Sequence, residues 1–134
     1  MALNLTLAAV DLKKTEKFYR EVLLLSPEFI QNSHAETSYL LLLVGRMKVV
    51  FQNLLEMEAH HPVLLQNLTR SPLGVGVQIE LSCNNLDDIY RRIKHYRWPI
   101  AYELDDQEHQ RRELWLHDPD GYLLVLNDEN TTLK

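Results

Sequence analysis

The feature that most constrains this chain is a strand-and-helix pattern that occurs twice. Residues 3–10, LNLTLAAV, alternate along the chain, and Asp11 is placed to cap a helical pattern over residues 12–25. The same order returns 74 residues later, where the alternating residues 75–85 lead to Asn85 and a second helical pattern. Two similar units in one chain favour an architecture of paired modules.

The first unit continues into two apolar runs and then loses its periodicity. Residues 38–45 and 47–53 predict a hairpin with its turn at Gly45. Residues 54–73 break the pattern and predict a connector. A short helix is expected after Pro62, because proline suits the first position of a helix.

The second unit carries clearer local signals. Asn85 is expected to cap its helix, with Asp88 in the capping-box position. Asp118-Pro119-Asp120-Gly121 predicts a type I turn with positive φ at the glycine, which pairs Trp115 with Val125. One face of this hairpin is then apolar, and the other carries Glu113, Trp115, His117, Leu123, Val125 and Asn127.

These patterns predict an α+β fold with both helices packed on one side of antiparallel-rich sheets. The chain is expected to form a single domain, 1–134. Module 1 covers about 1–53, the connector 54–73, module 2 about 74–128, and a short tail 129–134.

Composition narrows the classes of partner. The net charge is −5 and basic residues do not cluster, so nucleic acid is not expected as a partner. No run approaches the roughly 20 apolar residues of a membrane span, and the amino terminus lacks a signal-peptide pattern. The only cysteine, Cys83, excludes an internal disulfide. A cytoplasmic protein is expected.

The faces turned away from the helices are the candidate ligand-binding surface. They mix apolar and polar side chains, as small-molecule sites do. The candidate ligand-binding residues are Trp115, Gln52, Gln78, Asn4, Glu80, Glu113 and His117. The alternative is that the polar residues among them simply face solvent on exposed sheet.

The segments DLKKTEKFYREVLLLSPEF and RRELWLHDPDGYLLVLN together resemble the vicinal oxygen chelate superfamily of glyoxalase I, extradiol dioxygenases, and fosfomycin and bleomycin resistance proteins. The resemblance covers nearly the whole chain and is nearest to the metal-free bleomycin-resistance branch. It implies two βαβββ modules related by pseudo-twofold symmetry, cupped sheets with helices on the outer side, and a homodimer. The family pattern has glycine after Val22-Leu23, whereas this chain has Leu24.

The resemblance also implies where a divalent metal would be held. The four family positions fall on Asn4, Val50, Gln78 and Val125, with Gln52 as the alternative to Val50. Amide oxygens are weak ligands and valine has no donor atom. The usual metal site is therefore not expected, and neither is another cofactor.

Three functions remain open from the sequence. The first is a binding protein that holds a small cationic or aromatic molecule in a cleft, with Trp115 as an apolar surface. The second is a lyase-like or dioxygenase-like enzyme with a non-standard or metal-independent site, in which Glu80 or Glu113 acts as general base. The third is a dimer that fills its own cleft and acts through protein contacts. The first is preferred, and no catalytic residue is assigned.

Overall fold

The structure, a computed structural model, describes residues 1–31 and 38–128. The chain divides into two compact units, Met1–Leu73 and Gly74–Lys134. The expected tail at 129–134 lies outside the described residues, and the expectation of a single domain stays a prediction. In the described part of the chain, no helix is long and apolar enough to span a membrane.

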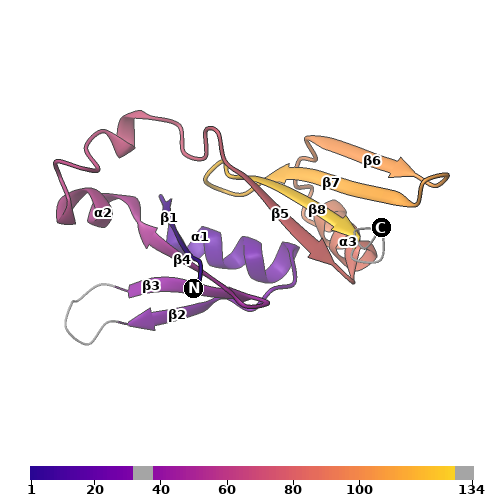
Figure 1. The fold of residues 1–134 in the computed structure, drawn as a ribbon, viewed down its shortest axis with the longest axis horizontal. Coiled ribbons are helices and arrows are strands. Elements are labelled where there is room, and N and C mark those ends of the chain that lie inside the picture. Colours follow the sequence, from indigo (N-terminus) through magenta and orange to yellow (C-terminus); the bar gives the residue numbers. More distant parts are fainter. Residues whose placement is uncertain (32–37, 129–134) are drawn as a thin grey trace. The chain divides into compact units, whose positions relative to one another are not determined.

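Unit 1 contains one βαβββ module followed by the connector. Its elements are β1 (Asn4–Ala9), α1 (Leu12–Lys17), a π-helical turn (Phe18–Val22), β2 (Glu28–Gln31), β3 (Ser38–Val44) and β4 (Met47–Asn53). The strands form one sheet in the order β1-β4-β3-β2, in which β1 and β4 are parallel and the other pairs antiparallel (Figure 1).

Unit 2 repeats this plan. Its elements are β5 (Gln78–Cys83), α3 (Leu86–His95), β6 (Tyr102–Asp106), β7 (Arg111–His117) and β8 (Leu123–Asp128). The strand order β5-β8-β7-β6 again places a parallel pair at one edge and antiparallel pairs beyond it. The predicted α+β class with two βαβββ modules is therefore confirmed.

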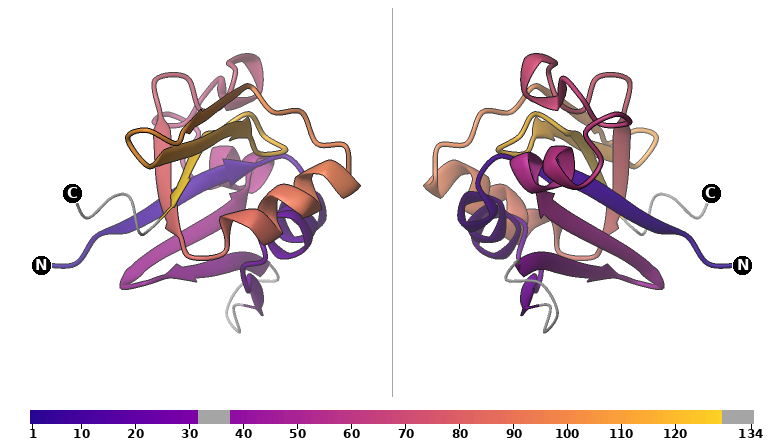
Figure 2. Two further views of the ribbon diagram at one scale, coloured as in Figure 1. Left: turned by 90° about the vertical axis from the view of Figure 1, so that its right-hand side faces the viewer. Right: turned by 90° about the vertical axis from the view of Figure 1, so that its left-hand side faces the viewer.

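The helices α1 and α3 each cover one face of the sheet in their own unit (Figure 2). In unit 1, Phe18 and Tyr19 pack edge to face, and the Tyr19 ring lies 5.0 Å from that of Phe51. In unit 2 the helix-facing leucines of β7 and β8 are fully buried, as the hairpin pattern predicted: Leu114, Leu116, Leu124 and Leu126. We call the opposite face of each sheet its open face.

The repeat extends to individual strand positions. In unit 1, Thr6 pairs with Val50, which pairs with Leu41, which pairs with Glu28. The corresponding row in unit 2 is Glu80, Val125, Trp115 and Tyr102. The two units thus present the same backbone frame with different side chains.

The Asp118–Gly121 turn forms as predicted. The amide N–H of Gly121 donates to the Asp118 carbonyl at 3.1 Å, and Gly121 has φ +99°. The Asp118 carboxylate accepts the amide N–H groups of Asp120 and Tyr122 at 2.9 and 3.0 Å. The predicted pairing of Trp115 with Val125 follows from this turn.

The prediction of a helix that begins at Pro62 is wrong. The connector instead contains α2, Leu54–His60, which ends before the proline, and a 3-10 turn at Leu68–Arg70. Asn53 starts α2, because its side chain accepts the amide N–H groups of Leu55 and Glu56. The helix stops at His61 because proline disfavours a helical conformation in the residue before it.

The capping predictions are half confirmed. Asp11 accepts the amide N–H groups of Lys13 and Lys14 at the start of α1. Asn85 makes no side-chain cap at α3, where its backbone ψ is +36° rather than extended, and Asp88 binds Arg91 instead of closing a capping box.

Both long helical segments end in a left-handed residue that is not glycine. Leu24 has φ +58° and Arg97 has φ +53°. After α3, Trp98 N–H donates to the Ile93 carbonyl and Arg97 N–H to the Lys94 carbonyl, which is the Schellman arrangement. Leu24 therefore occupies a conformation for which glycine is the favoured residue.

Candidate functional site

The open face of unit 2 brings together most of the predicted site residues. Its side chains come from four neighbouring strands in three rows, set by the register. The rows are Gln78–Leu123–His117, Glu80–Val125–Trp115–Tyr102 and Ser82–Asn127–Glu113–Leu104. Neighbouring strands lie about 4.8 Å apart, so adjacent members of a row are in direct reach of each other.

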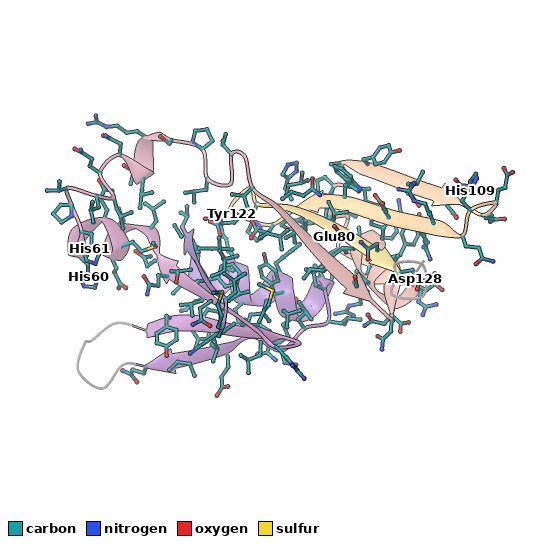
Figure 3. The ribbon with its side chains drawn as sticks, viewed as in Figure 1. His60, His61, Glu80, His109, Tyr122 and Asp128 are labelled. Atoms are coloured by element: carbon teal, nitrogen blue, oxygen red, sulfur yellow. The ribbon has the colours of Figure 1, made fainter. Side chains whose placement is uncertain are left out.

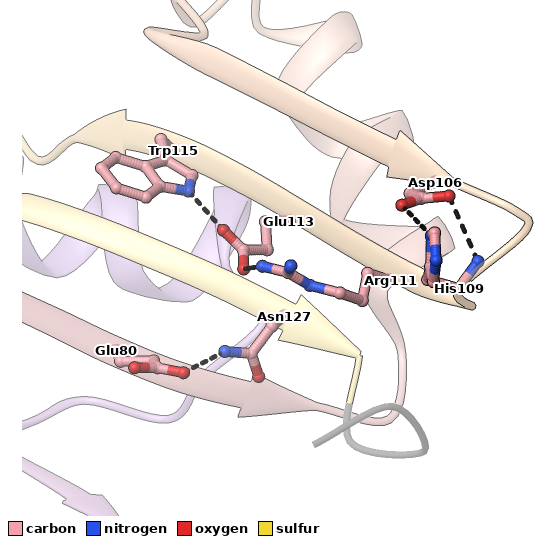
Figure 4. Close-up of polar contacts among 7 residues, drawn as sticks. All are labelled: Glu80, Asp106, His109, Arg111, Glu113, Trp115 and Asn127. Atoms are coloured by element: carbon pink, nitrogen blue, oxygen red, sulfur yellow. Dashed lines mark hydrogen bonds and ion pairs between the residues drawn. The ribbon is translucent and has the colours of Figure 1, made fainter. Parts of the chain in front are cut away.

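Trp115 is held by a carboxylate on its own strand (Figure 4). The indole Nε1–H donates to Glu113 Oε2 at 2.8 Å. The other oxygen of Glu113 accepts from Arg111 Nη2 at 3.2 Å. These residues alternate along β7 and therefore point to the same side of the sheet.

Tyr102 fixes the same indole from the neighbouring strand. Its ring centroid lies 5.7 Å from that of Trp115 with an interplanar angle of 83°. Such edge-to-face contacts contribute about 0.5–1.5 kcal/mol beyond the area they bury. The open face of unit 2 thus contains an aromatic pair whose geometry is set from two directions.

Asn127 connects the polar groups of β5. Its Nδ2–H donates to Glu80 Oε1 at 2.5 Å, and its Oδ1 accepts from the Ser82 hydroxyl at 3.0 Å. Asn127 is 4% exposed and Val125, beside it on the same face, is 3% exposed. A buried amide with two partners fixes the direction in which Glu80 lies.

The tip of the β6–β7 hairpin contains a separate His–Asp pair. His109 Nδ1 lies 2.8 Å from Asp106 Oδ2, and the His109 amide N–H donates to Asp106 Oδ1 at 3.2 Å. These hydrogen bonds hold the pKa of Asp106 below its usual value. Figure 3 shows His109 at the end of the hairpin, apart from Glu80.

His117 is exposed and ends β7. Its carbonyl accepts the Nε1–H of Trp98 at 2.8 Å, so the contact that the structure shows belongs to its backbone. His60 and His61 lie at the carboxyl end of α2 in unit 1 (Figure 3).

The remaining predicted residues lie on the open face of unit 1. Asn4 pairs with Lys48, and Gln52 pairs with Ala8. Val50 occupies the position in its row that Val125 occupies in unit 2. Val50, and not Gln52, is therefore the residue of unit 1 whose strand position matches that of Val125.

Sequence reasoning missed two residues of the unit 2 site, Tyr102 and Arg111. Tyr102 reaches Trp115 only through the register of β6 with β7, which depends on the turn at residues 107–110. That turn carries no glycine, and Gln110 supplies its positive φ of +53°. The sequence therefore offered no turn signal from which to derive the register.

Two βαβββ modules, each with a mixed four-stranded sheet, make this chain an α+β protein of paired modules. A model of the Glyoxalase/Bleomycin resistance protein/Dioxygenase superfamily matches residues 3–126, and the chain belongs to that superfamily. No curated protein matches the sequence significantly. The superfamily is thus confirmed, whereas the bleomycin-resistance branch stays a prediction.

Solved structures with the same fold carry different descriptions. A superfamily member from Sphaerobacter thermophilus aligns with a TM-score of 0.67 at 16% identity, covering 96% of this chain and 97% of that chain. A lactoylglutathione lyase from Agrobacterium tumefaciens aligns with a TM-score of 0.63 at 16% identity, covering 97% and 94%. An antibiotic binding protein from a Streptomyces species aligns with a TM-score of 0.64 at 15% identity, covering 96% and 94%. At these identities the likeness shows the fold alone.

The residues that the resemblance implies at the family's metal positions do not fit a divalent cation. Val50 and Val125 have no donor atom, and Asn4 and Gln78 offer only neutral amide oxygens. Across residues 1–31 and 38–128, no three His, Cys, Asp or Glu side chains lie together as metal ligands would.

Proposed function

We propose that this protein binds a small cationic or aromatic molecule in a cleft formed in part by the open face of unit 2, without the metal site that its superfamily commonly uses. The observation that carries the proposal is the combination of the fixed Trp115–Tyr102 pair with Glu80 in one row of the sheet. An aromatic surface beside a carboxylate attracts a flat cation by stacking and by charge.

The other residues of the proposed site would provide specificity. Gln78 is proposed to orient polar groups of the ligand, and His117 to donate or accept hydrogen bonds. Asn4 and Gln52, on the sheet of unit 1, stay predicted ligand-binding residues. Val50 and Val125 would leave two of the expected metal positions without a donor atom.

Fluorescence titration of the protein with a panel of cationic aromatic compounds tests the proposal. Binding should quench the emission of Trp115. Equilibrium dialysis, which does not depend on that emission, should show that Trp115→Phe binds about tenfold more weakly through loss of indole contact. Trp98→Phe is the control for the signal, since it leaves Trp115 as the remaining tryptophan of the chain and should keep the quenching. A panel that binds the wild type and Trp115→Phe equally well would contradict the proposed site.

An enzyme with a non-standard site is the second candidate. Elemental analysis after purification without chelator, and again after addition of Ni²⁺, Zn²⁺, Mn²⁺ or Fe²⁺, distinguishes binding alone from an enzyme that holds a metal at a non-standard site. Stoichiometric metal would support a lyase or dioxygenase, whereas protein without metal would favour binding alone.

The cellular context belongs to the same proposal. We expect a cytoplasmic homodimer with a small molecule as its only ligand. Sedimentation equilibrium at several protein concentrations tests the dimer.

A further inference from the structure

Glu113 has no free carboxylate oxygen. One oxygen accepts the indole N–H of Trp115 at 2.8 Å, and the other accepts from Arg111 at 3.2 Å. The Glu113 side chain is only 20% exposed, whereas that of Arg111 is 60% exposed. Arg111 therefore balances the negative charge of Glu113 from the solvent side. A cationic ligand then gains little electrostatic attraction from this carboxylate.

Glu80 is in a different electrostatic situation. Its Oε1 accepts from the neutral amide of Asn127, and no cationic side chain is paired with it among residues 1–31 and 38–128. Glu80 is also exposed. The row on the open face of unit 2 thus contains one carboxylate whose charge no neighbouring cation balances.

The spacing of the row suits one flat cation. Glu80 and Trp115 lie on either side of Val125 across three neighbouring strands, which separates their backbones by about 10 Å. An aromatic cation that covered the indole and extended across Val125 would reach the Glu80 side chain. The Tyr102 ring and the Glu113 hydrogen bond hold the indole in a fixed orientation.

We infer that Glu113 is a positioning residue, which fixes the Trp115 indole, and that Glu80 alone provides the negative charge that selects a monocationic aromatic ligand. This inference rests on the proposed function and assigns its two carboxylates different roles. Glutamine at position 113 can still accept the indole N–H, whereas alanine cannot. Glutamine at position 80 removes the selecting charge while keeping the size of the side chain.

The first measurement needs no ligand. Solvent exchange of the Trp115 indole N–H is followed by NMR, with the resonance assigned through Trp115→Phe and with Trp98 as internal control. Exchange should quicken at least about tenfold in Glu113→Ala and change less than about threefold in Glu113→Gln, because only alanine removes the acceptor. An unchanged exchange rate in Glu113→Ala would overturn the positioning role.

The second measurement compares two dyes of the same shape by equilibrium dialysis at pH 8, where 9-aminoacridine is a cation and acridine is neutral. The wild type should prefer 9-aminoacridine about tenfold, and Glu80→Gln should abolish that preference. Glu113→Gln should keep it, and Glu113→Ala should weaken both dyes alike.

The outcomes separate the two proposals. Loss of charge preference in Glu113→Gln would overturn the inference, because Glu113 would then act as an anionic contact. A wild type that binds neither dye would overturn the proposed binding of cationic aromatic compounds and with it the role of Glu80. In that case the exchange data alone would still decide whether Glu113 positions Trp115.

Discussion

At the scale of single residues, the chain departs from the usual choice where its two helical segments end. Leu24 and Arg97 both adopt left-handed backbone conformations, and neither is glycine. A side chain in that conformation costs roughly 1–2 kcal/mol through crowding of Cβ against the backbone. The family pattern with glycine after Leu23 is explained by this geometry.

Arg97→Gly should therefore give a more stable protein than Arg97→Ala, by about 1 kcal/mol in the free energy of unfolding. Both variants lose the same exposed side chain, so their difference reports the backbone conformation. The comparison is made by urea denaturation. At Arg91, inside α3, the order should reverse by about 1 kcal/mol, because alanine is favoured in a right-handed helix. Equal stability of the two Arg97 variants would contradict the left-handed assignment.

At the scale of elements, the sequence determined more of unit 2 than of unit 1. The Asp118–Gly121 turn specified its own geometry, and through it the register of β7 with β8. The four-residue β2 was missed, because Glu28–Gln31 has no clean alternation and leaves Phe29 44% exposed. Pattern reasoning also missed α2, whose cap Asn53 is at the same time the last residue of a strand.

The candidate site was predictable where it depended on alternation within a strand. Glu113, Trp115 and Asn127 were placed on one face by parity alone, and they do lie there. The partners of Trp115 were not predictable, since they depend on side-chain orientation and on a turn without a glycine signal. Only the structure shows which carboxylate of the site is paired with a cation.

Gly74 connects the start of unit 2 to the Asp118–Gly121 turn. A Cβ on Gly74 would meet the Gly121 carbonyl oxygen and Tyr122 at 3.0 Å, whereas a Cβ on Gly76 would meet nothing within 4 Å. The two glycines have similar φ angles of +81° and +78°. Gly74→Ala should therefore destabilise the protein by about 1–3 kcal/mol more than Gly76→Ala, through crowding alone.

Thermal denaturation of the two variants measures this difference. Gly76→Ala serves as the matched control, because it carries the backbone cost without the close contact. Equal losses of stability would show that the segment before β5 can move away from the turn.

Asp87 links α3 to β7 through its ion pair with Arg112. The hydrogen bond and charge of Arg112 lower the pKa of Asp87 below its usual value. A lowered pKa in the folded state means that this stabilisation is present above about pH 4 and is lost as the pH falls through the folded pKa. In an NMR carboxyl titration, Arg112→Gln should raise the midpoint of Asp87 toward the ordinary value.

Asp106 provides the control in the same titration, because its low pKa depends on His109 rather than on Arg112. Its midpoint should stay the same in Arg112→Gln. A midpoint of Asp87 that does not change would show that the ion pair is absent in solution.

At the scale of the whole molecule, the connector is an exposed segment that a protease can reach. Val63 and Leu64 are 79% and 82% exposed, and the chain between α2 and the 3-10 turn at Leu68–Arg70 forms no strand. Thermolysin, which cuts before apolar residues, should make its first cut among residues 62–66, and mass spectrometry of early fragments identifies it. A first cut within β7 or β8 would contradict this expectation.

The two units share a backbone frame but differ in what their open faces contain. The row with Glu80, Trp115 and Tyr102 in unit 2 corresponds to one with Thr6, Leu41 and Glu28 in unit 1. The charged and aromatic chemistry of the candidate site is therefore concentrated in the second half of the chain.

Because the strand positions correspond, the row of unit 2 can serve as a template for substitutions in unit 1. Three substitutions in unit 1, Thr6→Glu, Leu41→Trp and Glu28→Tyr, would copy the second row onto the first at matching strand positions. The repeated backbone thus allows the side chains of one row to be introduced at matching positions of the other without the design of a new backbone. The original row stays in the same chain for comparison.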